Sequence, residues 1–162
     1  MLVPVTTQPP SGPDAYRVCL VCLGNICRSA MAEVVLRSAL DKAGLADAVT
    51  VDSAGTGDWH VGQGMNRGAL AALARRGYDG SAHRARQFKP SWSGSRDLVL
   101  AMDSSNLADL RRMGVEAELF ADVAELSGVT DIPDPYGGVA ADFDYVLDLL
   151  EAAAPAIIAR LA

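Results

Sequence analysis

The stretch LVCLGNICRSAMAE, residues 20–33, changes character in its middle. It begins as an apolar run that is typical of a buried strand and ends with the spacing of an amphipathic helix. The helical pattern continues to about Ala43 and stops at Gly44, because glycine adopts the left-handed backbone that ends a helix. A strand that passes through a tight loop into a helix predicts the first unit of an α/β fold.

Further apolar runs and helical patterns alternate along the rest of the chain. The expected strands are residues 17–21, 49–53, 97–101 and 117–120. The expected helices are residues 29–43, 66–76, 104–113 and about 143–161, the last of which Pro155 should kink or split. Because strands that alternate with helices form parallel sheets, we predict a doubly wound α/β fold with a four-stranded parallel sheet and helices on both faces. We expect a single domain, residues 16–162, after a flexible proline-rich tail, residues 1–15.

Composition limits the classes of partner. The net charge of -6 argues against a broad surface for nucleic acid or for an anionic membrane, so we expect neither partner. No apolar run reaches the ~18 residues of a membrane span. The chain also does not open with the basic and apolar segments of a signal peptide. We therefore expect a cytoplasmic protein, with secretion without a signal peptide as the open alternative.

The cysteines lie together, in the first expected strand and the loop after it, at Cys19, Cys22 and Cys27. An odd number of clustered cysteines is not a secretory disulfide framework and favours reduced thiols. A zinc site needs more ligands than these and the two histidines, His60 and His83, provide. We expect no metal and no cofactor.

The loop between the first strand and the first helix suits an anion. Backbone N–H groups at a helix N-terminus converge on one spot, and the helix dipole adds positive potential. Gly24 gives the backbone room to turn, and Asn25 is one of the few other residues that tolerate a left-handed conformation. A nucleotide-binding P-loop is excluded, because the chain has no GxxxxGKS/T segment. The loop therefore predicts a phosphate site.

A thiol in this loop is predicted to be a nucleophile. At Cys22 the converging N–H groups favour the thiolate and lower the pKa of the thiol from its ordinary ~8.5. Ser29 can donate a hydrogen bond to the sulfur, and Arg28 can hold two phosphate oxygens with its planar guanidinium. Together these groups indicate an attack of sulfur on phosphorus.

The segment CLGNICRS, followed by AMAE, resembles the low-molecular-weight protein tyrosine phosphatases of bacterial type. The likeness covers about residues 16–160, through DSAGTGDWHVG at 52–62, GYDGSAHRARQF at 77–88, LVLAMDSSNLADLRR at 98–112 and DIPDPYGG at 131–138. The resemblance implies that Cys22 attacks the phosphate of a phosphotyrosine protein and that Asp134 is general acid and then general base. Inorganic phosphate is the implied product, and no cofactor is implied. The implied phosphate-binding residues are Leu23, Gly24, Asn25, Ile26, Cys27 and Arg28.

The resemblance also assigns supporting roles. Trp59 and Tyr136 match the walls of the aromatic-binding cleft, although Trp59 could equally be an ordinary surface aromatic. The residues that match those keeping the loop in shape are Asn25, Ser29 and His83. Cys27 is implied to close a reversible disulfide with Cys22, and the alternative is a small buried side chain. We expect a monomer or a weak dimer.

The remaining residues of interest have simpler interpretations. Asp103 either caps its helix or takes part in the chemistry, and Cys19 is expected to be inert packing inside the strand. Four arginines are expected to be solvated charges that could bias which phosphoproteins dock: Arg75, Arg76, Arg84 and Arg86.

Two departures from the family pattern concern specificity and stiffness. Ala30 stands where the family usually has proline, and the absence of that proline should make the loop more flexible. The segment DPYGG stands where the family usually has DPYYG, so one aromatic wall is missing and a glycine pair replaces it. Substrate preference and regulation through tyrosine are the properties that these departures affect.

Three rival functions fit the chain less well. A thiol-dependent arsenate reductase needs resolving cysteines later in the chain, and none follows Cys27, which leaves only a version that uses an external thiol. A phosphoarginine phosphatase resembles this loop but carries threonine at the position of Ile26. A phosphotyrosine-binding module would lack the nucleophile or the acid, and this chain has both. The sequence favours a phosphotyrosine phosphatase.

Overall fold

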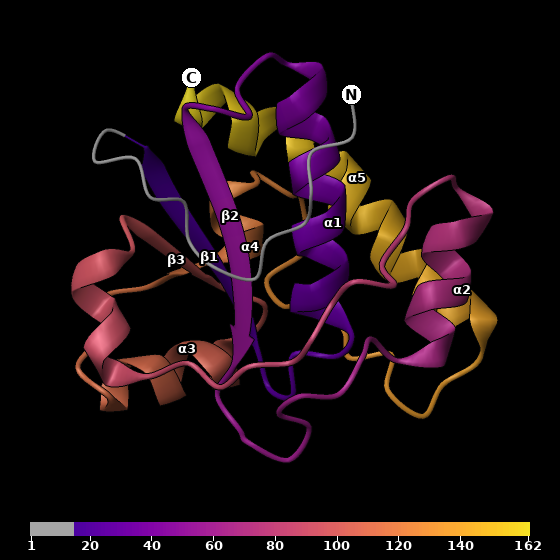
Figure 1. Ribbon diagram of the computed structural model, residues 1–162, viewed down its shortest axis with the longest axis horizontal. Coiled ribbons are helices and arrows are strands. Elements are labelled where there is room, and N and C mark those ends of the chain that lie inside the picture. The colour runs from indigo at the N-terminus through magenta and orange to yellow at the C-terminus, as the bar shows by residue number, and fades with distance from the viewer. Residues whose placement is uncertain (1–14) are drawn as a thin grey trace.

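The computed structural model describes residues 15–162. Its strands are β1 (Tyr16–Cys22), β2 (Val49–Gly55), β3 (Leu98–Ala101) and β4 (Glu118–Leu119). They form one sheet in the order β2-β1-β3-β4, and every neighbouring pair is parallel (Figure 1). The predicted four-stranded parallel sheet is confirmed. Apart from Ala15, the predicted N-terminal tail lies outside the described residues.

Helices cover both faces of the sheet, as predicted (Figure 1). The helices are α1 (Arg28–Lys42), α2 (Arg67–Arg75), α3 (Ser104–Arg112), α4 (Phe120–Val123) and α5 (Ala140–Leu161), with a 3₁₀ turn, η1 (Pro90–Ser95). Alternate side chains of β1 enter two separate cores, because successive residues of a strand face opposite sides. Val18 and Leu20 pack in the larger core with α1, α2 and α5, whereas Cys19 and Val21 pack in the smaller core with α3.

The expected bound of the fourth strand is wrong, and of the two alternatives for Pro155, a kink or a split, the split is absent. Phe120 does not continue the fourth strand but begins α4, because its side chain turns into the larger core and is buried there. Pro155 does not split the last helix, which runs unbroken from Ala140 to Leu161. Pro155 lies on the exposed side, while Leu150 and Ile157 to either side of it are buried in the same core. Their packing outweighs the hydrogen bond that proline cannot make.

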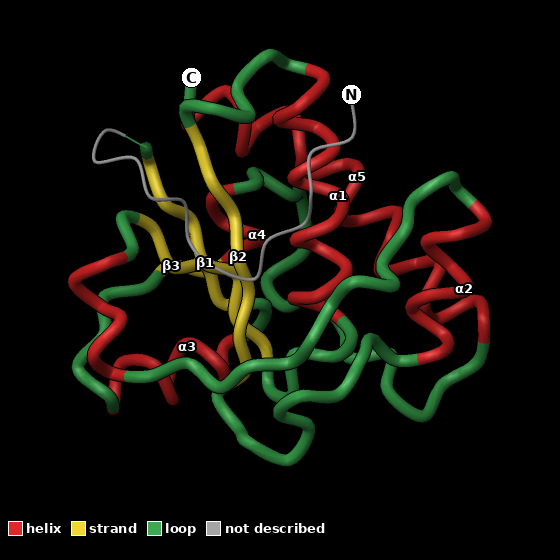
Figure 2. The backbone as a smooth tube through the Cα atoms, viewed as in Figure 1, coloured by secondary structure: helices red, strands yellow, loops and turns green. Residues whose placement is uncertain are grey.

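The carboxyl ends of the strands define the functional end of the molecule. In Figure 2 the loops that follow β1, β2 and β3 gather at one end of the sheet. Ligands of open parallel sheets bind at this end, beyond the strands. Cys22 is the last residue of β1 and Gly55 the last residue of β2, and the two are direct partners in the sheet. None of the helices within residues 15–162 has the length and apolar character needed to cross a membrane.

Candidate active site

The loop between β1 and α1, called here the Cys22 loop (residues 22–28), turns its carbonyl groups outward. Three of the carbonyl oxygens that follow Cys22 accept hydrogen bonds from other segments: Leu23 O from Gly57 N (2.9 Å), Asn25 O from His83 Nε2 (2.6 Å) and Ile26 O from Asn66 N (3.0 Å). In a planar trans peptide the carbonyl and the following N–H point in opposite directions. The N–H groups of Gly24, Ile26 and Cys27 therefore point inward. The sulfur of Cys22 lies on this inner side, 3.3 Å from the backbone N of Asn25.

The hydroxyl of Ser29 faces the sulfur. The Oγ of Ser29 lies 2.9 Å from the Sγ of Cys22. The same Oγ accepts a hydrogen bond from the Nδ2 of Asn25 at 2.8 Å. Because this bond uses the oxygen as acceptor, the hydroxyl proton of Ser29 is directed to the sulfur, and its other acceptor, Ala54 O, is more distant at 3.4 Å. Two hydrogen-bond donors, the amide of Asn25 and the hydroxyl of Ser29, therefore lie against the sulfur.

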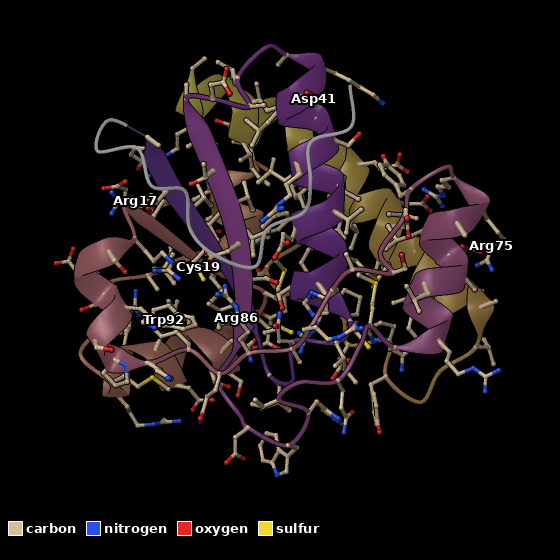
Figure 3. All side chains as sticks on the ribbon, in the orientation of Figure 1. Arg17, Cys19, Asp41, Arg75, Arg86 and Trp92 are labelled. Atoms are coloured by element: carbon tan, nitrogen blue, oxygen red, sulfur yellow. The ribbon has the colours of Figure 1, made fainter. Side chains whose placement is uncertain are left out.

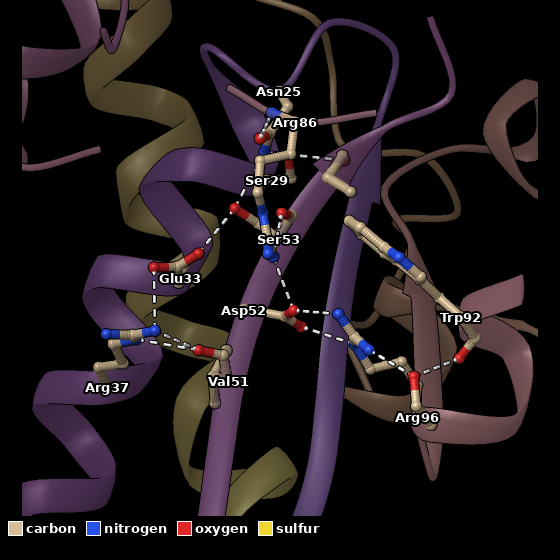
Figure 4. Close-up of polar contacts among 12 residues, drawn as sticks. Asn25, Ser29, Glu33, Arg37, Val51, Asp52, Ser53, Arg86, Trp92 and Arg96 are labelled. Carbon is tan, nitrogen blue, oxygen red and sulfur yellow. Dashed lines mark hydrogen bonds and ion pairs between the residues drawn. The ribbon is translucent and has the colours of Figure 1, made fainter. Parts of the chain in front are cut away.

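Asn25 is the central fixed point of the loop. Its φ is 58°, so it has the left-handed backbone that the sequence predicted. The Oδ1 accepts from the backbone N of Arg86 at 2.9 Å, and the Nδ2 also donates to the Oγ of Ser53 at 2.9 Å. Ser53 in turn donates to the Oε1 of Glu33 at 2.8 Å, so a chain of buried polar groups connects the loop to α1 (Figure 4). Sequence reasoning missed Ser53 and Glu33.

Burial changes the acid–base properties of this chain of groups. Burial raises the pKa of Glu33, and the charge of Arg37 and the hydrogen bond from Ser53 only partly oppose this. Burial also lowers the pKa of His83, and its hydrogen bond to the Asn25 carbonyl only partly opposes this. The neutral imidazole of His83 is therefore favoured, with its Nε2 proton directed to that carbonyl.

Gly55 permits the loop to approach β2 closely. A Cβ at this position would lie 2.6 Å from the carbonyl oxygen of Leu23 and 3.1 Å from the backbone N of Asn25. The obstacle is backbone, which cannot move aside as a flexible side chain can. Sequence reasoning did not assign Gly55 a role, because this contact depends on the pairing of β1 with β2.

The guanidinium of Arg28 is held at the inner side of the loop. Its Nη1 donates to the Oδ2 of Asp103 (2.6 Å) and to the carbonyl of Ile132 (3.0 Å). Burial lowers the pKa of Arg28, but the bond to Asp103 and the negative charges of Cys22, Asp134 and Asp103 outweigh it, so the pKa is raised and the group stays charged. Its Nε–H is buried and has no hydrogen-bond partner within the described chain. The edge of the guanidinium that carries Nε and Nη2 can therefore receive two oxygens of an anion.

Asp103 caps its helix, which is one of the two roles that the sequence left open, and it also pairs with Arg28. Its Oδ1 accepts from the backbone N of Asn106 at 2.7 Å, which caps α3. Its other oxygen, Oδ2, makes the ion pair with Arg28. The cap therefore fixes the carboxylate that orients the guanidinium.

The segment of residues 131–138, called here the Asp134 loop, brings a carboxylate to the site. The Oδ2 of Asp134 lies 3.7 Å from the Nη2 of Arg28, and its Oδ1 accepts from the backbone N of Tyr136 at 3.1 Å. The loop is anchored where the backbone N of Ile132 donates to the carbonyl of Met102 at 2.8 Å.

Aromatic side chains stand exposed near the loop. Trp59 is 66% exposed and its ring packs against Gly57, while Tyr136 is 61% exposed. The ring of His60, which sequence reasoning did not include, lies 6.1 Å from the ring of Tyr136 and also packs against Gly24. Gly24 belongs to the Cys22 loop and Tyr136 to the Asp134 loop, so His60 contacts both loops.

The remaining cysteines are free and buried. Burial, followed by the negative charges of Cys22 and Asp134, raises the pKa of Cys27 to about 12. Burial and the nearby Asp52 raise the pKa of Cys19, which lies inside β1. Among residues 15–162, no group of three or more His, Cys, Asp and Glu side chains is arranged to hold a metal ion.

The expectation that four arginines are solvated is wrong for one of them. Arg75, on the outer side of α2 in Figure 3, and Arg76 and Arg84 are exposed. Arg86 instead pairs with the buried carboxylate of Asp52, from Nη2 to Oδ2 at 2.7 Å. The segment after His83 runs beside β2, and this turns the Arg86 side chain toward the sheet.

Comparison with known proteins identifies the family of the chain. A family model described as low molecular weight phosphotyrosine protein phosphatase matches residues 17–162. The chain is similar to the low molecular weight protein-tyrosine-phosphatase of Streptomyces coelicolor, with 45% identity over 154 residues, 90% of this chain and 93% of that protein. It is also similar to low molecular weight protein-tyrosine phosphatase A of Mycobacterium tuberculosis, with 40% identity over 149 residues, 89% of this chain and 90% of that protein.

A solved structure shows the same fold. The crystal structure of a protein tyrosine phosphatase from Entamoeba histolytica superposes with a TM-score of 0.86 at 31% identity, covering 91% of this chain and 97% of that one. The resemblance drawn from the sequence is confirmed: the chain belongs to the low molecular weight protein-tyrosine-phosphatase family of enzymes.

Proposed function

We propose that this enzyme hydrolyses phosphotyrosine in proteins through a phosphocysteine intermediate on Cys22. One observation carries the proposal: the sulfur of Cys22 lies on the side of the loop to which the N–H groups point, together with the buried, unpartnered Nε–H of Arg28. A site with so many inward donors suits the oxygens of a phosphoryl group. The sulfur is then placed to attack the phosphorus of that group.

The reaction has two steps. In the first, the sulfur of Cys22 forms a bond to phosphorus as the bond from phosphorus to the phenolic oxygen breaks, and Asp134 gives its proton to that oxygen. In the second, a water molecule gives a proton to Asp134 and attacks phosphorus, the sulfur–phosphorus bond breaks, and inorganic phosphate leaves. The position of Asp134 near Arg28 supports this double role, because the bound phosphoryl group and the carboxylate share one neighbourhood.

The negative charge that develops on phosphorus is stabilised by fixed groups. The residues proposed to bind the phosphoryl oxygens are the backbone of Leu23, Gly24, Asn25, Ile26 and Cys27 and the guanidinium of Arg28. Donors that are already oriented need no rearrangement during the reaction, and removing one such donor typically costs about 10²–10³-fold in rate. Asn25, Ser29 and His83 are proposed to hold this arrangement through the hydrogen bonds described above.

The exposed rings favour an aromatic substrate. Trp59 and Tyr136, together with His60, offer flat apolar surfaces to the ring of a phosphotyrosine. Phosphate esters of serine lack such a ring and have a poorer leaving group. The proposed substrate is therefore a phosphotyrosine protein, acted on in the cytoplasm by a monomer or weak dimer.

We also propose that Cys27 protects the nucleophile. Peroxide would oxidise Cys22 to a sulfenic acid, and attack by the sulfur of Cys27 would release water and leave a Cys22–Cys27 disulfide, which a dithiol reduces. Burial is the largest cause of the raised pKa of Cys27, and the negative charge of Cys22 is the next. A neutral sulfenic acid at Cys22 removes the second of these causes.

Activity of wild type and two cysteine variants tests the proposal. We expect metal-free hydrolysis of p-nitrophenyl phosphate and phosphotyrosine peptides, and Cys22→Ser should lower kcat by at least about 10⁴-fold. The matched control is Cys27→Ser, which should keep the activity but lose its recovery by dithiothreitol after treatment with peroxide. Equal activity in Cys22→Ser would refute the mechanism. Faster turnover of phosphoserine or phosphoarginine, or of arsenate with added thiol, would refute the substrate.

A further inference from the structure

A partly buried cluster of charged and aromatic side chains lies beside the Cys22 loop and has no part in the mechanism above. This Asp52 cluster consists of Asp52, Arg86, Trp92 and Arg96 (Figure 4). Asp52 accepts from Arg96 at both carboxylate oxygens, with Nε–Oδ1 at 3.2 Å and Nη2–Oδ2 at 2.6 Å. It also accepts from the Nη2 of Arg86 at 2.7 Å. One carboxylate therefore holds two guanidinium groups.

Both arginines of the cluster also stack on the ring of Trp92. The guanidinium carbons of Arg86 and Arg96 lie 4.9 Å and 4.6 Å from the centre of the Trp92 ring. Both distances are within the range of a cation–π contact. Trp92 belongs to η1, and its ring also meets Phe88 edge to face at 5.5 Å. The indole therefore packs against both arginines of the segment that leads from α2 to β3, and Asp52 of β2 joins these arginines to the sheet.

Stability alone does not explain such a cluster. The side chains of Asp52 and Arg96 are only 4% and 3% exposed. Removing paired charges from water costs about as much as their attraction returns, so buried ion pairs are weak contributors to stability and serve better to select one geometry. The question is therefore which geometry this cluster selects.

Arg86 links the cluster to the Cys22 loop. Its backbone N donates to the Oδ1 of Asn25 at 2.9 Å, and its Nη2 donates to the carbonyl of Ser53 at 3.2 Å. Its own carbonyl accepts from the backbone N of Gly55 at 2.8 Å. The side chain of Arg86 is thus held by Asp52 and Ser53, and its main chain by Gly55. Asn25 contacts the main chain.

The amide of Asn25 transmits this position to the nucleophile. With its Oδ1 held by Arg86, the Nδ2 is oriented toward Ser29, whose hydroxyl faces the sulfur of Cys22. A displaced Arg86 would let the amide turn, and Ser29 would lose the donor that directs its proton to the sulfur. Each of these steps is a direct hydrogen bond.

We propose that the Asp52 cluster positions the Cys22 loop: Asp52, Trp92 and Arg96 hold Arg86, and Arg86 orients Asn25 and thereby Ser29. These four are positioning residues, since none of them touches the sulfur. The inference rests on the proposed role of Cys22 as the nucleophile that binds phosphate.

The decisive variant is Arg86→Met, which removes the guanidinium but keeps the backbone N–H and leaves Asp52 paired with Arg96. We expect kcat for p-nitrophenyl phosphate to fall roughly fivefold to tenfold, with a similar loss in inhibition by vanadate. In an Asn25→Gly background, which keeps the left-handed backbone but removes the amide, Arg86→Met should have no further effect. Non-additivity of this kind is the signature of two residues that act in series.

A matched control separates positioning from general stability. Arg76→Met removes an arginine that pairs with Asp148 and Glu151, joins α2 to α5 and has no hydrogen bond to the Cys22 loop. Its melting temperature should fall while kcat, KM and vanadate inhibition stay unchanged. A second pair, Trp92→Leu and Trp92→Phe, gives the same test without touching Arg86. Leucine should lower kcat, and phenylalanine, which keeps an aromatic face, should restore most of it.

The outcomes are distinct. Unchanged kcat in Arg86→Met and Trp92→Leu, or an equal fold loss with and without the Asn25 amide, would overturn the positioning role. If Arg86→Met does not fold, the Trp92 pair decides in the same way. A wild-type protein that does not hydrolyse p-nitrophenyl phosphate would instead overturn the proposed function, and the inference with it.

Discussion

The Cys22 loop and the Asp134 loop face the same guanidinium but are built in opposite ways. In the Cys22 loop, the buried Asn25 uses its carbonyl, its Oδ1 and its Nδ2 in hydrogen bonds to three other segments. In the Asp134 loop the side chain of Asp134 is 46% exposed. The loop is anchored to other segments at Asp131 and Ile132, but the hydrogen bonds from Asp134 to Gly138 are local, from Tyr136 N to Asp134 Oδ1 and from Gly138 N to Pro135 O.

The difference reflects what each loop must do. Donors that stabilise a developing charge act best when they are already in place, because any rearrangement during the reaction costs energy. A group that gives a proton to one oxygen and then takes one from a water molecule must serve two partners in turn. The first task favours a fixed loop inside the protein, and the second favours a loop with freedom at the surface.

Among variants that keep the nucleophile Cys22, the largest effect is expected in the Asp134 loop. Asp134→Asn removes the proton donor and should lower kcat for phenyl phosphate by about 10²–10⁴-fold. The loss should be smaller for p-nitrophenyl phosphate, whose leaving group needs less help from an acid. Inhibition by vanadate should be kept, because the Cys22 loop and the guanidinium of Arg28, which are proposed to bind the anion, are unchanged. Steady-state kinetics over a series of aryl phosphates measures these effects.

Asp131→Asn is the matched control for this prediction. Asp131 lies in the same loop, but its Oδ1 accepts from the backbone N and the hydroxyl of Ser104, and an asparagine oxygen can still accept there. Its kinetics should not depend on the leaving group. Equal sensitivity of the two variants to the leaving group would show that Asp134 is not the proton donor.

The Cys22 loop should lose its catalytic geometry when its packing against β2 is disturbed. Gly55→Ala places a methyl group against the backbone of Leu23, so the loop must shift. A displacement of about 1 Å at a reacting group costs about 10²-fold in rate, so both kcat and vanadate inhibition should fall by about that factor. Gly94→Ala is the control, because no heavy atom lies within 4 Å of a methyl group there. Full activity in Gly55→Ala would mean that the loop is not held rigidly by β2.

Sequence patterns predicted the strand, loop and helix that carry this site better than the residues that hold the loop in place. The change from strand to helical spacing around Cys22 is local, and it correctly predicted the first strand, the loop and the helix. The roles of Gly55 and Ser53 depend on the pairing of β1 with β2, which spacing along one segment cannot reveal. Arg86 was misread for the same reason, because its burial depends on a segment that returns to the sheet. Pro155 shows that tertiary packing can override a local preference.

A smaller effect is expected in the dependence of stability on pH. Burial lowers the pKa of His83 below its ordinary value of 6.5, with the charges of Arg86, Arg84 and Arg37 adding to the effect. Below pH 6.5 the unfolded chain therefore binds a proton that the folded protein resists. The contribution of His83 to the free energy of unfolding is therefore most favourable above pH 6.5 and decreases as the pH falls below 6.5. Denaturant titrations from pH 5 to pH 8 measure this slope.

His83→Gln should flatten this slope, because glutamine can donate to the Asn25 carbonyl without titrating. Glu33 acts in the opposite sense, since its raised pKa gives stability that is lost as the pH rises above its ordinary 4.5. This contribution is present in both proteins, so the difference between the two curves reports His83. Parallel curves for wild type and His83→Gln would mean that His83 does not resist protonation in the folded protein.

The smallest effect is expected from stiffening a loop that is already fixed. Ala30→Pro places proline in the first turn of α1, before the first helical hydrogen bond from Met31 N to Cys27 O, so no helical bond is lost. We expect the free energy of unfolding to rise by about 0.4–1 kcal/mol through the unfolded chain, with kcat unchanged. Ala39→Pro, in the interior of the same helix, should instead destabilise by about 3 kcal/mol or more. Urea unfolding and steady-state kinetics give both quantities.

A loss of stability in Ala30→Pro would mean that the buried site has no room for the ring. An altered kcat would mean that the Cys22 loop still moves during catalysis, and the contrast with the Asp134 loop would then be one of degree.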